Sequence, residues 1–424
     1  MQQPSPPTPG LGVRRAALRL LDAVLRRGLP LEAEIAQATR DLSPIDRAQA
    51  IAIAGEVCRH RPDLDALIDS ATRQPLAQDV KVRMVLRMAL AQILILKTPA
   101  HAAIATALPL LERGPRRLAH GVLGNLVRAG ATIPSPPNLP ADVAARWGKA
   151  WGAEMLAGAA GAITSPPPLD LVIKTAADAP LWAERLGGTS LLAGHVRIPR
   201  TGDVTQLTGF ADGAWWVQDL AAAIPARLLG AGAGRSVLDI GAAPGGKTMQ
   251  LAAADWRVTA LDPSERRLGM LRANLQRTAL CAEIVQSSLA KYQGDTQFDA
   301  VLLDAPCSAT GIFRRHPDVL HRVDARDIAN RAAMQGDMLA DAAGRVRAGG
   351  TLIYAVCSLE PAEGEEQIDR FLTNHGAWAI APVDADELPD GIAPDARGHV
   401  RTLPQHCAAA GGIDGFFIAR LVKN

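Results

Sequence analysis

The chain lacks the features of a disulfide-bonded, zinc-binding or membrane-embedded protein. No stretch reaches the ~18 apolar residues of a membrane span, and the start MQQPSPPTPG has no apolar core of a signal peptide. Its five cysteines contain no C-x-x-C pair, which excludes a disulfide framework and the usual zinc spacing. We therefore expect a soluble cytoplasmic protein with neither a metal site nor a membrane partner. The cysteines are Cys58, Cys281, Cys307, Cys357 and Cys407.

Aromatic residues are also scarce. They make up 4% of the chain, with two Tyr and six Phe, which argues against an RNA-binding surface built on repeated aromatic stacking. Hydrophobic residues at 48% and charged residues at 21% are typical of globular proteins and exclude a chain that stays disordered. At about 100–200 residues per domain, 424 residues predict two to four domains.

Charge is unevenly distributed along a chain whose net charge is only +2. Residues 1–130 hold 18 Lys and Arg against 11 Asp and Glu, whereas the remainder holds 27 against 32. A basic front part fits a polyanion partner, because Lys and Arg supply most phosphate contacts. Solvated helix faces would give the same imbalance, so charge alone leaves both interpretations open.

The front of the chain has a helical pattern. Apolar residues recur at helical spacing through residues 11–133, which predicts six or seven short helices after a disordered tail at 1–10. The segment ATIPSPPNLP (131–140) then predicts a linker, because successive prolines remove backbone donors and favour extended backbone.

The remainder divides into two parts. Residues 141–230 combine helical segments with strands at LDLVIKT and WWVQD, which predicts a small α+β domain. From 231 to 424, apolar runs of strand length alternate with amphipathic helices. That alternation predicts a parallel, doubly wound α/β sheet.

A glycine-rich turn follows the first strand of this last part. In SVLDIGAAPGGKTMQL a buried strand runs through a turn into a helix, the arrangement that binds a ligand at a helix N-terminus. Residues 241–248 also match G-x-x-x-x-G-K-[ST], so a P-loop nucleotide triphosphatase is one alternative. Asp262 ends the next strand 21 residues after Gly241, where a carboxylate binds ribose hydroxyls; it is equally a helix-capping position. The Ala and Pro residues of the turn leave few amide donors for three phosphates, which favours a nucleoside ligand.

Two later strands each run into a Cys-Ser pair, in FDAVLLDAPCSATG and TLIYAVCSLEP. Because ligands of open parallel sheets bind at the carboxyl ends of strands, we expect Cys307 and Cys357 to face the same crevice as the glycine-rich turn. A single strand-end cysteine is more often an apolar filler. Two such cysteines, with Asp304 nearby, favour a catalytic role over a filling role.

Methylation of cytosine at carbon 5 needs such a set of residues. A thiolate adds to carbon 6, and a carboxylic acid at N3 stabilises the charge that the addition creates. Carbon 5 then accepts the methyl group, and a base removes the carbon-5 proton so that the thiol can leave.

At this point the motifs resemble a known family. The segments DIGAAPGGKT, ALDPSERRL, DAPCSATGIFRRHPDV, AVCSLEPAEGEEQI and DGFFIARL resemble, in order, the bacterial 16S ribosomal RNA cytosine-5 methyltransferases of the Sun/Fmu type. Residues 11–130 more loosely resemble the NusB-like RNA-binding domain of that family. The resemblance implies an all-α NusB-like N-terminal domain, a small α+β domain and a Rossmann-like methyltransferase domain. We expect the protein to act as a monomer on unassembled or partly assembled 16S ribosomal RNA, although the sequence itself does not reveal the oligomeric state.

The resemblance also implies residue roles. Cys357 would be the nucleophile, Cys307 would assist product release, and Asp304 would lie between cofactor and base. Three positions depart from the family pattern: Gly241 replaces a usual Cys, Val356 a usual Thr, and Ser288 a usual Asp at the adenine end. The residues implied to bind S-adenosylmethionine are Gly241, Ala242, Ala243, Pro244, Gly245, Gly246, Lys247, Asp262, Ser288 and Asp304.

A basic segment follows Cys307. In GIFRRHPDVLHRVDARD (311–327) we expect Arg314, Arg315, His316 and Arg322 to contact RNA phosphates, although an ordinary solvated segment would look the same. His316 is also a candidate for the missing base. A non-catalytic RNA-binding assembly factor is a second alternative, motivated by the basic front part and by Ser288.

Overall fold

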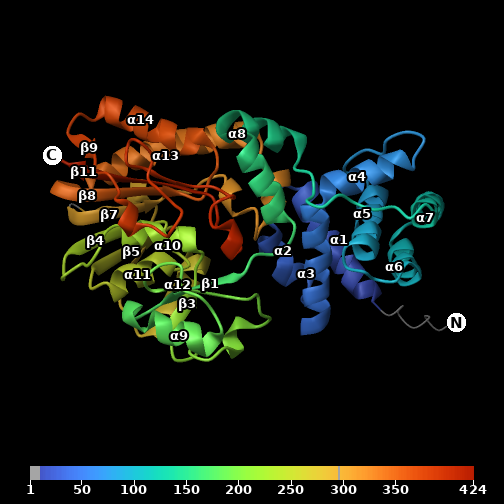
Figure 1. The fold of residues 1–424 in the computed structure, drawn as a ribbon, viewed down its shortest axis with the longest axis horizontal. Helices are drawn as coiled ribbons and strands as arrows, with labels where there is room; N and C mark the ends of the chain where they lie inside the picture. The colour runs from blue at the N-terminus through green and yellow to red at the C-terminus, as the bar shows by residue number, and fades with distance from the viewer. Residues whose placement is uncertain (1–9, 295–296) are drawn as a thin grey trace. The chain divides into compact units, whose positions relative to one another are not determined.

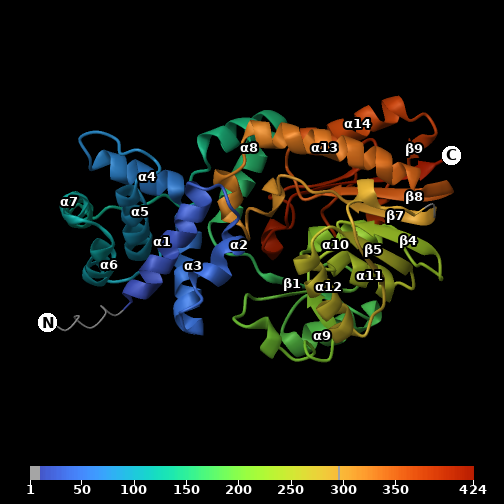
Figure 2. The same ribbon diagram turned by 180° about the vertical axis from the view of Figure 1, so that it is seen from behind.

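The computed structural model describes residues 10–294 and 297–424, so the tail expected at 1–10 lies outside the described residues apart from Gly10. The chain forms two compact units (Figures 1 and 2). Among the described helices, none is both long and apolar enough to cross a membrane. Among the described residues, the first unit comprises 10–149, 159–165 and 315–323; the second comprises 150–158, 166–294, 297–314 and 324–424.

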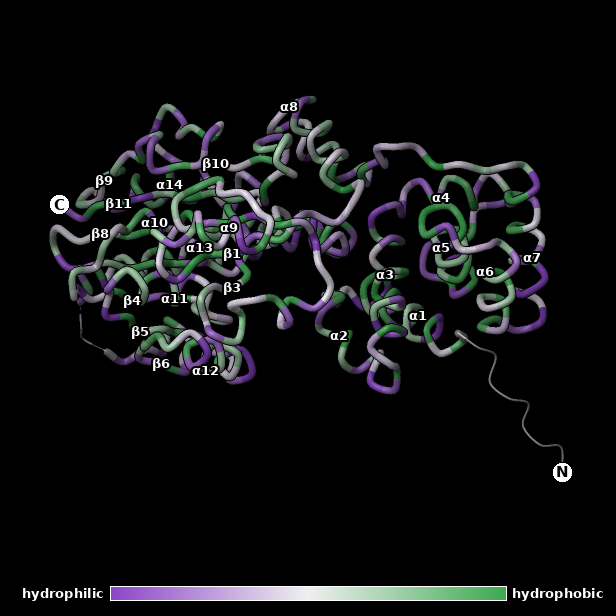
Figure 3. Tube along the Cα trace, turned by 60° about the horizontal axis from the view of Figure 1, so that its bottom comes forward, coloured by the Kyte–Doolittle hydropathy of each residue, from purple (hydrophilic) through white to green (hydrophobic). Residues whose placement is uncertain are grey.

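The first unit is helical, as the apolar spacing predicts. Its central helix α5 packs against α1, α3, α4, α6 and α7. Figure 3 shows apolar stretches in α4 and α5 and a polar stretch along α7, whose arginines at 113, 116 and 117 are exposed. The helices are α1 (Leu11–Leu25), α2 (Leu31–Ala38), α3 (Pro44–Arg59), α4 (Arg61–Ser70), α5 (Lys81–Leu94), α6 (Ala100–Ala107) and α7 (Arg113–Arg128).

Part of the positive charge of this unit is structural. Arg83 and Arg87 on α5 are fully buried. Both donate to Asp65, at 2.8 and 2.7 Å, and Arg83 also donates to Asp69 at 2.8 Å. Because these guanidinium groups are paired inside the unit, they are removed from any polyanion surface.

A distant segment of the chain completes the first unit. The short helix η6 (Pro317–His321) packs against α3, and the Asp318 carboxylate accepts the backbone N–H of Leu31 at 3.3 Å. Burial lowers the pKa of His321 to about 4, so the ring is neutral and its Nε2–H donates to the carbonyl of Cys58 at 2.6 Å. A piece of the loop after Cys307 thus belongs to the helical unit.

Helix α8 (Ala141–Ile163) follows the Pro-rich segment and is broken at Gly152, where φ is 81°. The linker predicted at 131–140 contains neither a helix nor a strand. The domain boundaries expected near 133 and 230 stay predictions, since the two units divide the chain differently.

The second unit contains a small antiparallel sheet of order β2-β1-β3. Two of its strands, β1 (Leu169–Ile173) and β3 (Trp215–Val217), lie where the sequence predicts them, beside α9 (Ala179–Leu186). The third, β2 (His195–Ile198), was missed, because HVRI has only four residues, too few for its alternation of polar and apolar residues to stand out.

The large sheet of this unit has the order β10-β11-β8-β7-β4-β5-β6, with β9 paired to β11. Neighbouring strands from β8 to β6 are parallel, but β9, β10 and β11 are antiparallel, so the prediction of an entirely parallel sheet was wrong at one edge. The apolar run FFIARLVK specifies a buried strand but carries no information on its direction. The strands are β4 (Ser236–Ile240), β5 (Arg257–Asp262), β6 (Glu283–Gln286), β7 (Phe298–Asp304), β8 (Val346–Val356), β9 (Trp378–Ile380), β10 (Val400–Thr402) and β11 (Phe416–Lys423).

Helices cover both faces of this sheet. Alternate residues of each strand point to opposite faces, and the two faces form separate apolar clusters. In both views α13 and α14 lie on one side and α10, α11 and α12 on the other (Figures 1 and 2). The helices are α10 (Leu220–Arg227), α11 (Gly246–Ala253), α12 (Glu265–Thr278), α13 (Ala325–Gly344) and α14 (Glu365–Asn374).

Strand order places a crevice between β4 and β7. The chain passes from β4 outward to β5 and β6 and then returns to β7 on the other side of β4. At such a switch point the two loops that leave β4 and β7 diverge, and ligands of open α/β sheets bind there.

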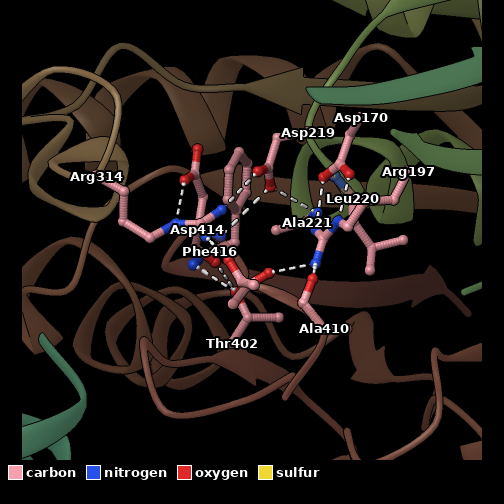
Figure 4. Close-up of polar contacts among 12 residues, drawn as sticks. Asp170, Arg197, Asp219, Leu220, Ala221, Arg314, Thr402, Ala410, Asp414 and Phe416 are labelled. Carbon is pink, nitrogen blue, oxygen red and sulfur yellow. Dashed lines mark hydrogen bonds and ion pairs between the residues drawn. The ribbon is translucent and has the colours of Figure 1, made fainter. Parts of the chain in front are cut away.

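A buried polar network joins the small sheet to the large one (Figure 4). Arg197 on β2 donates twice to Asp170 on β1, at 2.6 and 2.8 Å, and also to the carbonyls of Ala410 and Gly412 in the loop before β11. Asp170 also accepts the backbone N–H of Leu220, the first residue of α10. Burial alone raises the pKa of Asp170, but the hydrogen bonds from Arg197 hold it well below its usual range.

Replacing Asp170 tests this network. Asp170→Asn should lower the free energy of unfolding by about 3 kcal/mol at pH 7, because it leaves the buried Arg197 cation uncompensated. A carboxyl with a depressed native pKa stabilises the fold above its unfolded pKa of about 4, so the deficit should shrink below that pH. Urea unfolding followed by tryptophan fluorescence measures both effects.

The control is Glu265→Gln, which removes an exposed ion pair with Arg272 on α12 and should leave the unfolding midpoint unchanged. An Asp170→Asn midpoint equal to that of the wild type at pH 7 would contradict the stabilising role of the network.

Candidate active site at the carboxyl ends of the strands

The glycine-rich loop between β4 and α11 lies close to β7. Gly241 has a φ of +79°, and a Cβ there would approach the carbonyl oxygen of Asp304 to 2.5 Å. Gly245 has a φ of +114°, and a Cβ there would meet Leu271 at 2.5 Å. Glycine is therefore required at both positions by left-handed backbone and by close packing. Gly241, which stands where the family resembled by the sequence usually has Cys, is the residue at this close approach to β7.

The backbone of the loop does not form a phosphate cradle. Gly241 and Ala242 donate their N–H groups to the carbonyl of Leu261, at 2.9 and 3.2 Å, and Ala243 donates to Asp262 at 3.3 Å. The hydroxyl of Thr248, which would coordinate magnesium in a P-loop, donates instead to Asp239 at 2.5 Å. Because successive amides point into the protein, the geometry disfavours the triphosphatase alternative.

Asp262 lies at the end of β5, as expected for a ribose-binding carboxylate, and is fully buried. Its Oδ1 accepts the N–H of Ser264 at 2.9 Å, and its Oδ2 forms an ion pair with Arg267 at 3.0 Å. Arg267 also donates to the carbonyl of Ala243. The arginine, which the sequence did not single out, lies against the surface where a ribose would bind.

Ser288 occupies the same edge of the sheet. It follows β6, whose Gln286 pairs with Asp262 in register. Its side chain is half-buried and forms no hydrogen bond with the described residues. The hydroxyl is thus available at the expected adenine end, without the charge of the Asp that it replaces.

Asp239, on β4 directly before the loop, carries a buried oxygen that no described residue satisfies. Its Oδ2 accepts from Thr248, whereas its Oδ1 has no partner among the residues of 10–294 and 297–424. Burial raises the pKa of Asp239 to about 7, and the Thr248 hydrogen bond only partly opposes that rise. An unsatisfied carboxylate oxygen beside a close-packed glycine loop and Asp262 fits a nucleoside ligand that carries an amino group. The loop residues 241–246 and Asp262 would hold it.

Lys247 links the loop to β7. Its ammonium donates to Oδ2 of Asp304 at 2.8 Å and lies 5.7 Å from the centre of the Phe416 ring. Burial alone lowers the pKa of Lys247, but the neighbouring Asp304 raises it overall, so the side chain stays an ammonium. Oδ1 of Asp304 forms no hydrogen bond with another described residue, and the side chain keeps 29% of its surface exposed. That oxygen is therefore open to a ligand.

The two strand-end cysteines meet. Strands β7 and β8 are parallel neighbours in which Asp304 pairs with Ala355, so their carboxyl ends bring Cys307 and Cys357 together with a distance of 3.4 Å between the sulfur atoms. The hydrogen bond with Cys357, burial and the nearby Glu363 raise the pKa of Cys307 well above its usual value. Cys307 therefore remains a thiol at neutral pH, and its sulfur and that of Cys357 lie within hydrogen-bond distance, with either thiol able to donate.

The expected RNA-binding residues are not placed together. Arg314 is 2% exposed and forms ion pairs with Asp219 and Asp414, at 3.1 Å each (Figure 4). Its expected phosphate contact is corrected, because its charge is neutralised inside the second unit, where it holds the loop that follows Cys307.

The other three residues belong to the segment of the first unit at 315–323. Arg322 forms an ion pair with Asp318 at 3.1 Å, and His316 lies 3.7 Å from Glu32. The role of His316 as the base stays a prediction. Contacts of Arg315, His316 and Arg322 with RNA stay predictions.

Comparison with known proteins identifies relatives of both parts of the chain. The family described as 16S rRNA methyltransferase RsmB/F matches residues 226–422, and the NusB family matches residues 12–128. Ribosomal RNA small subunit methyltransferase B of Erwinia tasmaniensis is 33% identical over 437 residues, covering 97% of this chain and 99% of the relative. The protein of the same name from Xanthomonas campestris is 34% identical over 441 residues, covering 98% of each.

Solved structures share the fold. A methyltransferase homolog protein from Pyrococcus horikoshii is 26% identical, covers 71% of this chain and 98% of its own, and superposes with a TM-score of 0.56. The protein PH0851 superposes with a TM-score of 0.75 at 21% identity and covers 98% of this chain and 99% of its own. These similarities agree with the helical front part and the α/β catalytic part described above.

The buried carboxyl of Asp239 predicts a pH-dependent stability. Its native pKa of about 7 lies above the usual 3.8, so the folded protein binds the extra proton and loses stability as the pH rises from about 4 to about 7. Asp239→Asn removes this charge without changing the shape. The melting temperature of the variant relative to the wild type should therefore rise as the pH increases from about 4 to about 7 and should change little above that.

A matched control is Asp386→Asn, whose side chain is exposed and should give no pH-dependent difference. A difference in melting temperature between wild type and Asp239→Asn that stays constant from about pH 4 to about pH 7.5 would contradict the raised pKa of Asp239.

Proposed function

Because the chain belongs to the RsmB/F family of 16S rRNA methyltransferases, we propose that it methylates carbon 5 of a cytosine in 16S rRNA through a covalent bond between Cys357 and carbon 6. It is an S-adenosylmethionine-dependent rRNA methyltransferase with a NusB domain at its front. The target atom and the covalent step go beyond what family membership states, and they rest on the geometry of the crevice.

The observation that carries the proposal is the approach of two cysteine sulfurs to 3.4 Å beside an acid–lysine pair. Carbon 5 of cytosine is too electron-poor to accept a methyl group without prior addition of a nucleophile at carbon 6. A site that offers two adjacent thiols and an acid meets that need. None of these groups is required for methyl transfer to a nitrogen or an oxygen with a free electron pair.

In the addition step the sulfur of Cys357 bonds to carbon 6. The thiol proton of Cys357 passes to solvent in this step, and the S–H of Cys307, whose sulfur lies 3.4 Å away, is placed to donate a hydrogen bond to the attacking sulfur. The electron pair displaced from the ring moves toward N3, where the open oxygen of Asp304 is placed to meet the base. The ammonium of Lys247, bonded to the other oxygen of Asp304, supplies a proton for N3 through that carboxyl group.

S-adenosylmethionine, when bound, supplies the electrophilic methyl group. We propose that residues 241–247 and Asp262 hold it, with Ser288 at the adenine end and Asp304 between cofactor and base. The support is the close approach of the loop to β7, the unsatisfied oxygen of Asp239 and the carboxylate at the end of β5. Arg267 must leave Asp262 for the ribose hydroxyls to bind there.

Release reverses the addition. A base removes the carbon-5 proton, the bond between sulfur and carbon 6 breaks, and N3 returns its proton to the acid–lysine pair. Cys307 is the neighbour of the departing sulfur and takes part in this step. Its raised pKa keeps Cys307 a thiol, which is placed to donate a hydrogen bond to the sulfur of Cys357 as that sulfur departs.

Recognition of RNA falls to the helical unit. A cytosine inside a helix cannot present carbon 6 to Cys357, so the target must lie in an unpaired or unfolded segment. The exposed arginines of α7 and the net positive charge of residues 1–130 fit phosphate contacts to such a segment. We propose unassembled or partly assembled 16S rRNA as the substrate and a monomer as the active form.

Removing the nucleophile tests the covalent step. Cys357→Ala should lower methyl transfer to 16S rRNA by at least ~10⁴-fold while S-adenosylmethionine still binds, because the loop and Asp262 are untouched. Tritium transfer measures the first quantity and calorimetry the second. Cys281→Ala, which removes an exposed cysteine, is the control and should be fully active. Methyl transfer by Cys357→Ala at the wild-type rate would exclude the mechanism, and an inactive wild type would favour a non-catalytic assembly factor.

Removing the second cysteine tests the release step. Cys307→Ala should still bond to RNA but release it slowly, with turnover lowered roughly 10²–10⁴-fold. Denaturing gels of the protein with labelled RNA should then show a covalent band much stronger than that of the wild type. Normal turnover without any such band would remove Cys307 from the release step.

A further inference from the structure

The residue after each cysteine is a serine, and both serines bind one carboxylate. Ser308 donates its backbone N–H to Oε1 of Glu363 at 2.8 Å and its hydroxyl to Oε2. Ser358 donates its hydroxyl to the same Oε2. The two hydroxyl oxygens are 3.1 Å apart. Glu363, in the short helix that follows β8, is thus the point where the two cysteine loops are joined.

This carboxylate is buried without a cation. Glu363 and Ser358 are fully buried, and Ser308 is 1% exposed. Within the described ranges no Lys, Arg or His forms an ion pair with Glu363; Gln335 of α13 instead donates to its Oε1 at 3.0 Å. A buried carboxylate with no counter-charge is unfavourable unless its oxygens accept several hydrogen bonds. Here four donors from three separate segments supply them.

The donors require two acceptor oxygens. A Gln side chain of the same shape would present one oxygen and one amide nitrogen, and the nitrogen would face either the Ser308 and Ser358 hydroxyls or the donors of Ser308 and Gln335. At least two of the four bonds would be lost or reversed. A side chain with two acceptor oxygens is therefore matched to this place, beyond any need to fill space.

We propose that Glu363 is a positioning residue of the cysteine pair, which fixes the separation of the Cys307 and Cys357 sulfurs by holding Ser308 and Ser358 on one carboxylate. This inference rests on the proposed two-cysteine chemistry. Glu363 itself touches neither sulfur nor substrate in this role. It acts through the serine that follows each cysteine. A second hydrogen bond also joins the two cysteine loops: Gly311, four residues after Cys307, donates its N–H to the carbonyl of Cys357 at 3.0 Å.

Misplacement of one sulfur has a defined consequence. Attack on carbon 6 and the later release depend on the two sulfurs lying at set distances from the ring, and displacement by about 1 Å lowers such rates roughly 10²-fold. The binding of S-adenosylmethionine depends on the loop after β4 and on Asp262, which Glu363 does not contact. The inference thus predicts a loss in kcat with little change in the affinity for S-adenosylmethionine.

The test compares Glu363→Gln with the wild type in the full-length protein. The single-turnover rate of methyl transfer to 16S rRNA should fall roughly 10- to 100-fold, while the dissociation constant of S-adenosylmethionine measured by calorimetry should change less than about twofold. Glu366→Gln, an exposed acid three residues on, is the matched control and should keep the wild-type rate. A Glu363→Gln rate within about twofold of the wild type would overturn the proposal.

A second set of variants decides the matter if Glu363→Gln does not fold. The serine variants Ser308→Ala and Ser358→Ala should each lower the rate, and in the double variant the losses should be non-additive, since both act through the same carboxylate. Wild-type rates in both single variants would overturn the proposal. Cys357→Ala is measured in parallel: if it stays active, the proposed function fails, whereas an inactive Cys357→Ala beside a fully active Glu363→Gln removes only the role of Glu363.

Discussion

The parallel pairing of β7 with β8 is the constraint on which the site depends. A Cys-Ser pair follows directly after β8 and, with two residues between, after the end of β7, and because Asp304 pairs with Ala355 the two cysteines leave the same edge of the sheet, with their sulfurs 3.4 Å apart. A slip of the register by one residue would turn one cysteine to the opposite face. The apolar residues that alternate along both strands fix this register, so the core of the sheet determines the chemistry at its edge.

Several polar and charged residues of the basic segment 311–327 form contacts inside the protein. Arg314 is buried between Asp219 and Asp414, and the following segment completes the helical unit through Asp318 and His321. Cys307 therefore begins a loop that is held at several points along its length. In the helical unit, the side chains of Arg83 and Arg87 are likewise buried inside the protein.

Much of the fold and the position of the site followed from the sequence. Strands that end in glycine, aspartate or cysteine predict a common crevice in any parallel sheet, and Gly241, Asp262, Asp304, Cys307 and Cys357 do line the same edge. The direction of β11 and the existence of β2 did not follow, because a short or uniformly apolar strand carries no directional pattern. Partners of charged residues were equally hidden. Among the acids of EPAEGEEQ, nothing distinguishes the buried Glu363 from the exposed Glu366, and the basic run around Arg314 looks solvated.

Identification of the atom that bonds to the base tests the central claim most directly. The wild-type protein would be incubated with S-adenosylmethionine and 16S rRNA made with 5-fluorocytidine. Carbon 5 of this nucleotide carries fluorine in place of the proton that the base must remove, so release is blocked. After digestion, mass spectrometry locates the nucleotide on a peptide. The account predicts a methylated pyrimidine bonded to Cys357. A nucleotide bonded to Cys307, or no bonded nucleotide under conditions in which unmodified RNA is methylated at the full rate, would contradict it.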